Sequence, residues 1–148
     1  MKKQFSKYWK ASKQPRKQRK YAAEAPLHIK HKFLAANLSK ELRKKYSKRS
    51  FPLRKGDTVR IMRGSFKGKT GKIEIVNLKR TKVSIEKIQR AKKDGTKVNV
   101  FFRPSNLQIK ELNLDDKKRM ESIKRALFKK ETLERKEEEK GENEGEKK

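Results

Sequence analysis

The sequence feature that most constrains the fold is a pair of alternating apolar patterns separated by closely spaced glycines. Val59 and Ile61 alternate with polar residues before the glycines, and Ile73 and Ile75 do so after them. A period of two places one face of a β-strand in a core and the other in solvent. The glycines between the patterns, which let the chain reverse tightly, are Gly64, Gly68 and Gly71. We therefore predict two antiparallel strands joined by residues 62–72, which we call the glycine loop.

Three more strands are predicted C-terminal to this pair. Val83 and Ile85 alternate with polar residues, and the sequence Lys-Asp-Gly-Thr at residues 93–96 is typical of a hairpin turn. Alternation resumes over residues 98–102, and a last short strand covers residues 107–110. Five short strands connected by turn signals predict a mainly β fold, a small five-stranded barrel.

The composition limits how much of the chain this barrel can include. Of the 148 residues, 31% are hydrophobic and 43% are charged, whereas a globular domain is roughly half apolar and a quarter charged. We therefore expect one small domain with long solvated or partner-ordered arms. The absence of cysteine fits an intracellular protein, and no apolar run approaches the ~20 residues of a membrane span.

Apolar and charged residues are unevenly distributed and predict five segments. These are a basic arm at 1–23 that is disordered when free, an apolar strap and short basic helix at 24–50 with Ser39 as N-cap, the barrel at 51–112, a C-terminal α-helix at 113–140, and a disordered tail at 141–148. Met120, Ile123 and Leu127 have the spacing of one apolar helix face. Asp115 and Asp116 precede them, as capping carboxylates do.

No residues point to catalysis. Residues 64–70 resemble a nucleotide-binding P-loop, but three rather than four residues separate the glycines, and a strand pattern follows instead of a helix. His28 and His31 could place two metal ligands on one helix face, but with no cysteine and only Glu24 nearby, a surface or phosphate-facing pair is favoured. We expect no enzymatic activity, metal or cofactor.

The charge pattern instead favours nucleic acid as the partner. Forty-six Lys and Arg against 18 Asp and Glu give a formal net charge of +28 and a pI near 10.5, which is typical of nucleic-acid-binding proteins. The cations gather in the N-terminal third and in the turns, interleaved with aromatic residues such as Tyr8 and Trp9. For these two rings, and for Phe66 in the glycine loop, base stacking and structural packing both remain open. Phe101 and Phe102 are expected in the barrel wall and core.

Two parts of the glycine-loop region, Lys55–Val59 and Gly64–Ile73, resemble a KOW motif, which is found in ribosomal proteins and transcription elongation factors. Other segments narrow the choice: residues 12–20, 25–29, 38–43, 59–64 and 103–107. Together they resemble the archaeal branch of the large-subunit ribosomal protein twenty-four family, whose eukaryotic counterpart is ribosomal protein twenty-six. The resemblance covers about residues 12–116, so the first eleven residues and the helix beyond about Arg125 depart from it.

This resemblance implies an SH3-like barrel that binds large-subunit rRNA early in assembly, near the mouth of the peptide exit tunnel. It implies a cytoplasmic, ribosomal location, with neighbouring large-subunit proteins and factors at the exit tunnel as further partners; no homo-oligomer is expected. The residues that we expect to contact rRNA are Lys13, Arg16, Lys17, Arg19, Lys20, His28, Arg43, Lys44, Lys45, Arg49, Arg54, Lys55, Arg63, Gly64, Phe66, Lys67, Gly68, Lys69, Gly71, Lys72, Arg103 and Ser105.

Two other functions remain open from the sequence. A transcription elongation module would use a KOW barrel to contact polymerase and DNA, but it normally carries a second domain, for which these 148 residues leave no room. A general DNA-compacting protein would share the positive charge. A ribosomal protein should prefer rRNA over duplex DNA at matched salt, whereas a DNA-compacting protein should not.

Overall fold

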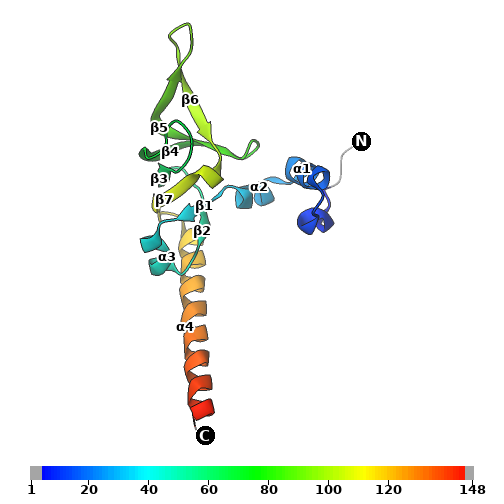
Figure 1. Cartoon of the computed structure of the whole chain (residues 1–148), viewed down its shortest axis with the longest axis vertical. Coiled ribbons are helices and arrows are strands. Elements are labelled where there is room, and N and C mark those ends of the chain that lie inside the picture. Colours follow the sequence, from blue (N-terminus) through cyan, green and yellow to red (C-terminus); the bar gives the residue numbers. More distant parts are fainter. Residues whose placement is uncertain (1–4, 146–148) are drawn as a thin grey trace.

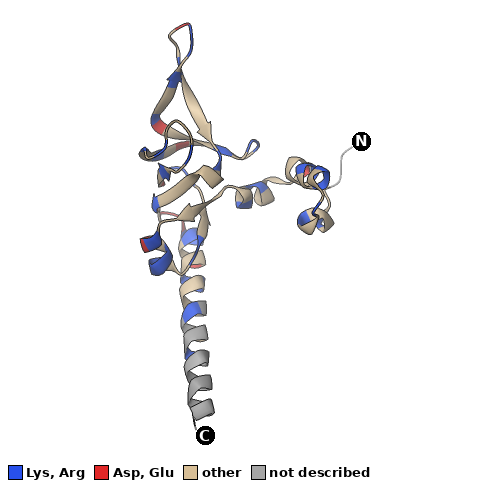
Figure 2. Cartoon of the chain, in the orientation of Figure 1, with Lys and Arg blue, Asp and Glu red and all other residues tan. Residues whose placement is uncertain are grey.

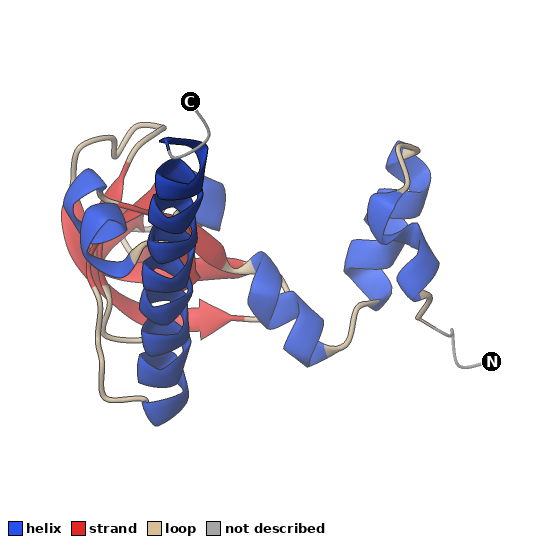
Figure 3. Cartoon of the chain, turned by 90° about the horizontal axis from the view of Figure 1, so that it is seen from below, coloured by secondary structure: helices blue, strands red, loops and turns tan. Residues whose placement is uncertain are grey.

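The computed structural model describes residues 5–145, which form a β-sheet carrying helices at both ends of the chain (Figure 1). The elements are η1 (Lys7–Ala11), α1 (Pro15–Glu24), α2 (Leu27–Phe33), β1 (Ala35–Leu38), α3 (Lys40–Tyr46), β2 (Ser50–Pro52), β3 (Thr58–Ile61), β4 (Thr70–Asn77), β5 (Lys82–Ala91), β6 (Lys97–Phe102), η2 (Pro104–Asn106), β7 (Leu107–Glu111) and α4 (Lys117–Gly145). In both Figure 1 and Figure 3, η1 and α1 lie apart from the sheet and are joined to it through α2. No helix in the described part is long and apolar enough to cross a membrane.

The sheet is mainly antiparallel and has seven strands in the order β2-β1-β7-β3-β4-β5-β6. The predicted mainly β fold is confirmed, but the sheet has two strands more than the five predicted and is not a closed barrel: β2 and β6 are the edges, and no strand pairing joins them among residues 5–145. The additional strands are β1 and β2, which pair with each other, and β1 also pairs in parallel with β7. The sequence of β1 is Ala-Ala-Asn-Leu, which lacks β-branched residues. Its conformation is therefore set by its neighbours, not by local propensity.

The alternation predicted for β4 and β5 fails at two positions. Ile73 is buried, but Ile75 is 43% exposed because the β4–β5 register shifts between them. Such a bulge adds a residue to one strand and turns the next side chain to the other face. In β5, Ser84 is fully buried between Val83 and Ile85, although its polarity predicted a solvent-facing position.

Two local predictions are confirmed. The Ser39 hydroxyl accepts a hydrogen bond from the Leu42 backbone N–H at 3.3 Å and caps α3. At the β5–β6 turn, Lys92 N–H bonds to Thr96 O at 2.9 Å, and Gly95 has a φ of +81°. A positive φ of this size favours glycine.

Helix α4 begins at Lys117, directly after the predicted capping residues Asp115 and Asp116. The Asp116 carboxylate accepts a hydrogen bond from the Lys118 N–H at 3.0 Å, so the capping role is confirmed for this residue. Ile123 is buried in the core, and Leu127 packs against it from the next turn. The helix extends to Gly145, five residues into the predicted tail, and residues 146–148 of that tail lie outside the described residues.

The predicted basic arm, residues 1–23, contains η1 and most of α1. Its first four residues lie outside the described residues. Disorder of this arm in the free protein stays a prediction.

A buried ion pair joins α4 to the sheet. Arg119 Nη1 and Nη2 donate to Asp57 Oδ1 and Oδ2 at 2.7 and 2.8 Å, with the two side chains 2% and 0% exposed. Asp57 also accepts from the backbone N–H groups of Arg54 and Asn113. The carboxylate therefore holds together the segment before β3, the segment after β7 and the first turn of α4.

Candidate nucleic-acid interface

The glycine loop is a compact turn closed by backbone hydrogen bonds. Gly68 N–H donates to Ile61 O at 2.8 Å, and Lys67 N–H donates to Gly64 O at 3.0 Å. Gly64 and Gly68 have φ values of +94° and +90°, which L-residues rarely adopt. The two glycines thus set the path of the loop.

The cations of this loop are available to an anionic partner. All four, Arg63, Lys67, Lys69 and Lys72, are exposed. None of them forms an ion pair within residues 5–145, and Figure 2 shows basic residues along the turns of the sheet. Cations that form no ion pair can contact phosphate oxygens without first breaking an internal salt bridge.

The ring of Phe66 packs inward from this loop. It is partly buried, lies edge-on to Phe102 with centroids 6.0 Å apart, and has Lys69 Nζ 5.3 Å from its centroid. Of the two roles left open for Phe66, this geometry favours loop packing over base stacking.

Gly71 has a different role from the other two glycines, because it lies in β4 opposite Val59 and its φ is not positive. A Cβ at this position would lie 2.6 Å from Ile85 Cγ2 and 3.3 Å from Glu86 O. Ile85 is 1% exposed and belongs to the buried core cluster.

Replacing Gly71 with alanine should lower the free energy of unfolding by about 1–3 kcal/mol, because it overpacks the core. Urea denaturation followed by circular dichroism measures this loss. Ile85→Leu removes the clashing Cγ2 branch, so the double variant Gly71→Ala/Ile85→Leu should recover part of the stability. Strictly additive losses would contradict the assigned contact.

Arg103 and Ser105 lie near the start of the glycine loop. They are exposed in and beside η2, and the carbonyl of the adjoining Asn106 accepts a hydrogen bond from Met62 N–H at 2.8 Å. The structure therefore brings the loop cations and the η2 turn together as one surface, although 40 residues separate Arg63 from Arg103 in the sequence.

The predicted arm residues form a second basic surface. Gln18 Nε2 donates to the carbonyls of Trp9, Lys10 and Ser12, at 3.0, 3.2 and 2.7 Å, and so folds η1 back onto α1. The ammonium groups of Lys17 and Lys20 lie 6.0 and 5.1 Å from the Trp9 ring centroid. Trp9 is thus partly covered by cations, whereas Tyr8 is 94% exposed. The other predicted cations of α1 and the preceding turn, Lys13, Arg16 and Arg19, are exposed.

A third group of predicted cations lies on and after α3. Lys44, Lys45 and Arg49 are exposed. Arg43 instead donates from Nε to Leu38 O at 2.9 Å and from Nη2 to Asn37 Oδ1 at 2.6 Å. Arg43 therefore fastens α3 to β1, in addition to any contact with a partner.

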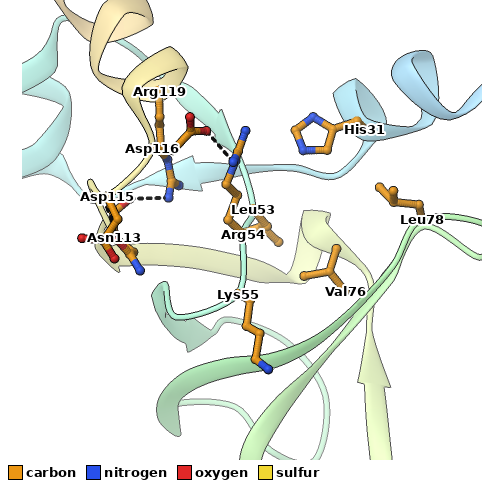
Figure 4. A pocket seen from close by; sticks show the side chains of 10 residues that line it. All are labelled: His31, Leu53, Arg54, Lys55, Val76, Leu78, Asn113, Asp115, Asp116 and Arg119. Atoms are coloured by element: carbon orange, nitrogen blue, oxygen red, sulfur yellow. Dashed lines mark hydrogen bonds and ion pairs between the residues drawn. The ribbon is translucent and has the colours of Figure 1, made fainter.

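Arg54 and Lys55 line a pocket between α2, the sheet and the start of α4, which sequence reasoning missed (Figure 4). Arg54 forms an ion pair with Asp116, so part of its charge is compensated internally. His31 faces these residues, and its pKa is lowered, first by burial and then by the positive charge of Arg54. His28 lies outside this pocket and is exposed. Within residues 5–145 no group of three or more His, Cys, Asp or Glu could hold a metal ion.

Comparisons with known proteins cover most of the chain. The family model that describes the eukaryotic ribosomal proteins L26 and their archaeal counterparts, the ribosomal proteins L24, matches residues 12–126. A protein named large ribosomal subunit protein uL24 from Methanosphaera stadtmanae is 46% identical over 116 residues, which cover 78% of this chain and 99% of that protein. A protein of the same name from Methanosarcina barkeri is 46% identical over 114 residues, covering 77% of this chain and 98% of that protein.

Proposed function

The chain belongs to the family of the eukaryotic ribosomal proteins L26 and the archaeal ribosomal proteins L24, and from this premise we propose that it is a structural constituent of the large ribosomal subunit. Its role is to bind large-subunit rRNA, without catalysing a reaction. The observation that carries the proposal is the glycine loop, whose four exposed cations have no internal ion pair among the described residues.

The strands around this loop have the order β7-β3-β4-β5-β6. We propose that these five strands correspond to the SH3-like KOW unit, with β1 and β2 added at the β7 edge. The curvature needed for a partly open barrel is supported by the register shifts in the β3–β7, β4–β5 and β5–β6 pairs, because bulges increase the local twist of a strand.

The proposed contacts with rRNA come from three surfaces: the glycine loop with η2, the arm, and α3. Lys and Arg on these surfaces neutralise phosphates and release counterions, so affinity should fall steeply with salt. Binding early in assembly, a position near the exit tunnel, contacts with neighbouring large-subunit proteins and contacts with exit-tunnel factors belong to the same proposal, and family membership supports them.

Sedimentation of cell extract through sucrose gradients at low and high salt tests the proposed function. Co-migration with the large subunit that survives a high-salt wash is the expected result. A position at the top of the gradient, or with RNA polymerase, would contradict the ribosomal assignment while leaving the fold unchanged.

The variant Gly68→Val should weaken binding to large-subunit rRNA by roughly tenfold, because a β-branched residue at positive φ costs about 1–3 kcal/mol unless the loop rearranges. The fold should survive, since no atom lies within 4 Å of the position of a Cβ at Gly68. Filter binding at fixed salt measures the effect. Ser65→Val, which adds the same side chain at a neighbouring exposed position with no positive φ, is the control. Equal affinity of the two variants would remove the loop from the proposed interface.

A further inference from the structure

A second pocket lies where the arm approaches the sheet, away from the glycine loop. It has a volume of about 650 Å³ and is lined by residues of η1, α1, α2 and the β4–β5 turn. Figure 1 shows this turn reaching from the sheet toward the arm. None of the residues that line this pocket is among those named above as expected rRNA contacts.

The floor of the pocket is aromatic. Tyr21 is 9% exposed and is held between Phe5 and Phe33, with ring centroids 4.9 and 5.9 Å away. Phe33 is 37% exposed and lines the pocket together with Ile29. The Phe33 ring thus contacts a buried ring and is still more than a third exposed, so a planar ligand can pack on it.

The rim of the pocket is cationic. Lys7, Lys10, Lys32 and Lys79 line it and are exposed, and none of their ammonium groups forms an ion pair in the part of the chain whose side chains the structure describes. Gln18 also lines the pocket, but its amide N–H groups already donate to three carbonyls of the arm. The pocket therefore combines an apolar floor with four positive charges that form no ion pair. The amide N–H groups of Gln18 are hydrogen-bonded to the arm.

We propose that this pocket binds one unpaired nucleotide of an RNA strand. The base packs on Phe33, and the lysines contact the phosphates on either side, as in proteins that combine stacking platforms with basic grooves. The volume lies within the range of pockets for small ligands. A base inside a duplex cannot reach the floor, because both of its faces are stacked. The proposal rests on the proposed rRNA binding and assigns a site to it. The amide N–H groups of Gln18 already donate within the arm, so Gln18 offers no free amide donor to a base edge.

The rim is tested by fluorescence anisotropy of the full chain with a fluorescein-labelled single-stranded hexa-adenylate RNA. The double variant Lys10→Ala/Lys79→Ala removes two rim charges and should weaken binding about tenfold near physiological salt. Arg80→Ala/Lys118→Ala removes two exposed charges, one beside Lys79 and one on α4, and neither residue lines the pocket. This control should weaken binding by less than about threefold. Equal losses in the two variants would overturn the proposal.

The floor is tested with Phe33→Leu, which keeps apolar volume but removes the ring. With 2-aminopurine in the hexanucleotide, binding to the unaltered chain should quench the fluorescence by stacking, and the variant should lose this quenching and about tenfold in affinity. An unchanged circular dichroism spectrum checks that the fold is retained. If hexaglutamate peptide competes as well as the RNA does, and is equally sensitive to Phe33→Leu, the pocket is an acidic-peptide site and the nucleotide proposal is overturned.

The sucrose-gradient experiment separates this proposal from the one on which it rests. If the unaltered chain sediments with the large subunit but the rim variant and its control bind the hexanucleotide equally, only the pocket assignment is overturned. If the unaltered chain does not sediment with the large subunit, the proposed ribosomal function is overturned, whatever the hexanucleotide result.

Discussion

Replacing Arg119 with alanine should lower the free energy of unfolding by about 3–5 kcal/mol, because it leaves a buried carboxylate without its charged partner. The loss is a large fraction of the ~5–15 kcal/mol that stabilises a typical domain. Arg119 also donates to the carbonyls of Asn113 and Pro52, at 2.7 and 3.2 Å, and its guanidinium lies 5.2 Å from the centroid of the Phe51 ring. The substitution therefore removes one side chain that contacts three parts of the fold.

Urea denaturation monitored by circular dichroism measures the effect as a lower midpoint at an unchanged slope. Arg125→Ala is the matched control, because Arg125 is an exposed arginine of the same helix; its effect should stay within about 0.5 kcal/mol. The double variant Asp57→Ala/Arg119→Ala should be less destabilised than the sum of the single variants, because it leaves no unpaired charge. Additive losses, or a small effect of Arg119→Ala alone, would show that the pair does not hold α4 to the sheet.

The sequence predicted those elements whose conformation is decided locally. The alternation around Val59 and Ile61 predicted β3, the Asp-Gly pair predicted the β5–β6 turn, and Ser39 predicted the start of α3. In each case a short stretch of chain contains both the signal and its physical cause, so no distant residue is needed to interpret it.

The features that sequence reasoning missed depend on residues far apart in the chain. Strand β1 exists because Asn37 pairs with Gln108, and Ile75 is exposed because of a register shift against β5. Asp57 and Arg119 are separated by 62 residues. Asp57 follows a glycine, and Arg119 lies on a basic helix. Either residue would be expected at the protein surface, so neither indicates a buried ion pair by itself.

In the candidate interface, too, the sequence indicated the local features and missed those that depend on distant residues. The loop cations were identifiable because glycines and cations alternate within one short segment. The ion pair of Arg54 with Asp116 was not, because its two residues come from different elements. The pocket around Phe33 was missed for the same reason: its floor and rim come from four elements, and none of them has a recognisable motif.

Removing all four cations of the glycine loop should weaken rRNA binding about a thousandfold near physiological salt. The variant is Arg63→Ala/Lys67→Ala/Lys69→Ala/Lys72→Ala. At ~0.15 M salt, release of about 0.9 counterion per phosphate contact contributes roughly 1 kcal/mol to the binding free energy. Losing four such contacts therefore lowers the affinity about a thousandfold. The slope of log affinity against log salt should become shallower by about three to four, one unit for each lost phosphate contact.

The decisive comparison is with a variant that loses the same net charge elsewhere. Lys117→Ala/Lys118→Ala/Lys124→Ala/Arg125→Ala also removes three lysines and one arginine, all exposed and all on α4. If the loop contacts phosphates directly, the loop variant loses both affinity and salt slope, while the α4 variant loses only the small long-range attraction that salt screens. Equal changes would mean that the overall charge of the chain, not the geometry of the glycine loop, attracts the RNA. Filter binding across a salt series distinguishes the two, because local phosphate contacts change the slope and a uniform charge effect changes it equally for both variants.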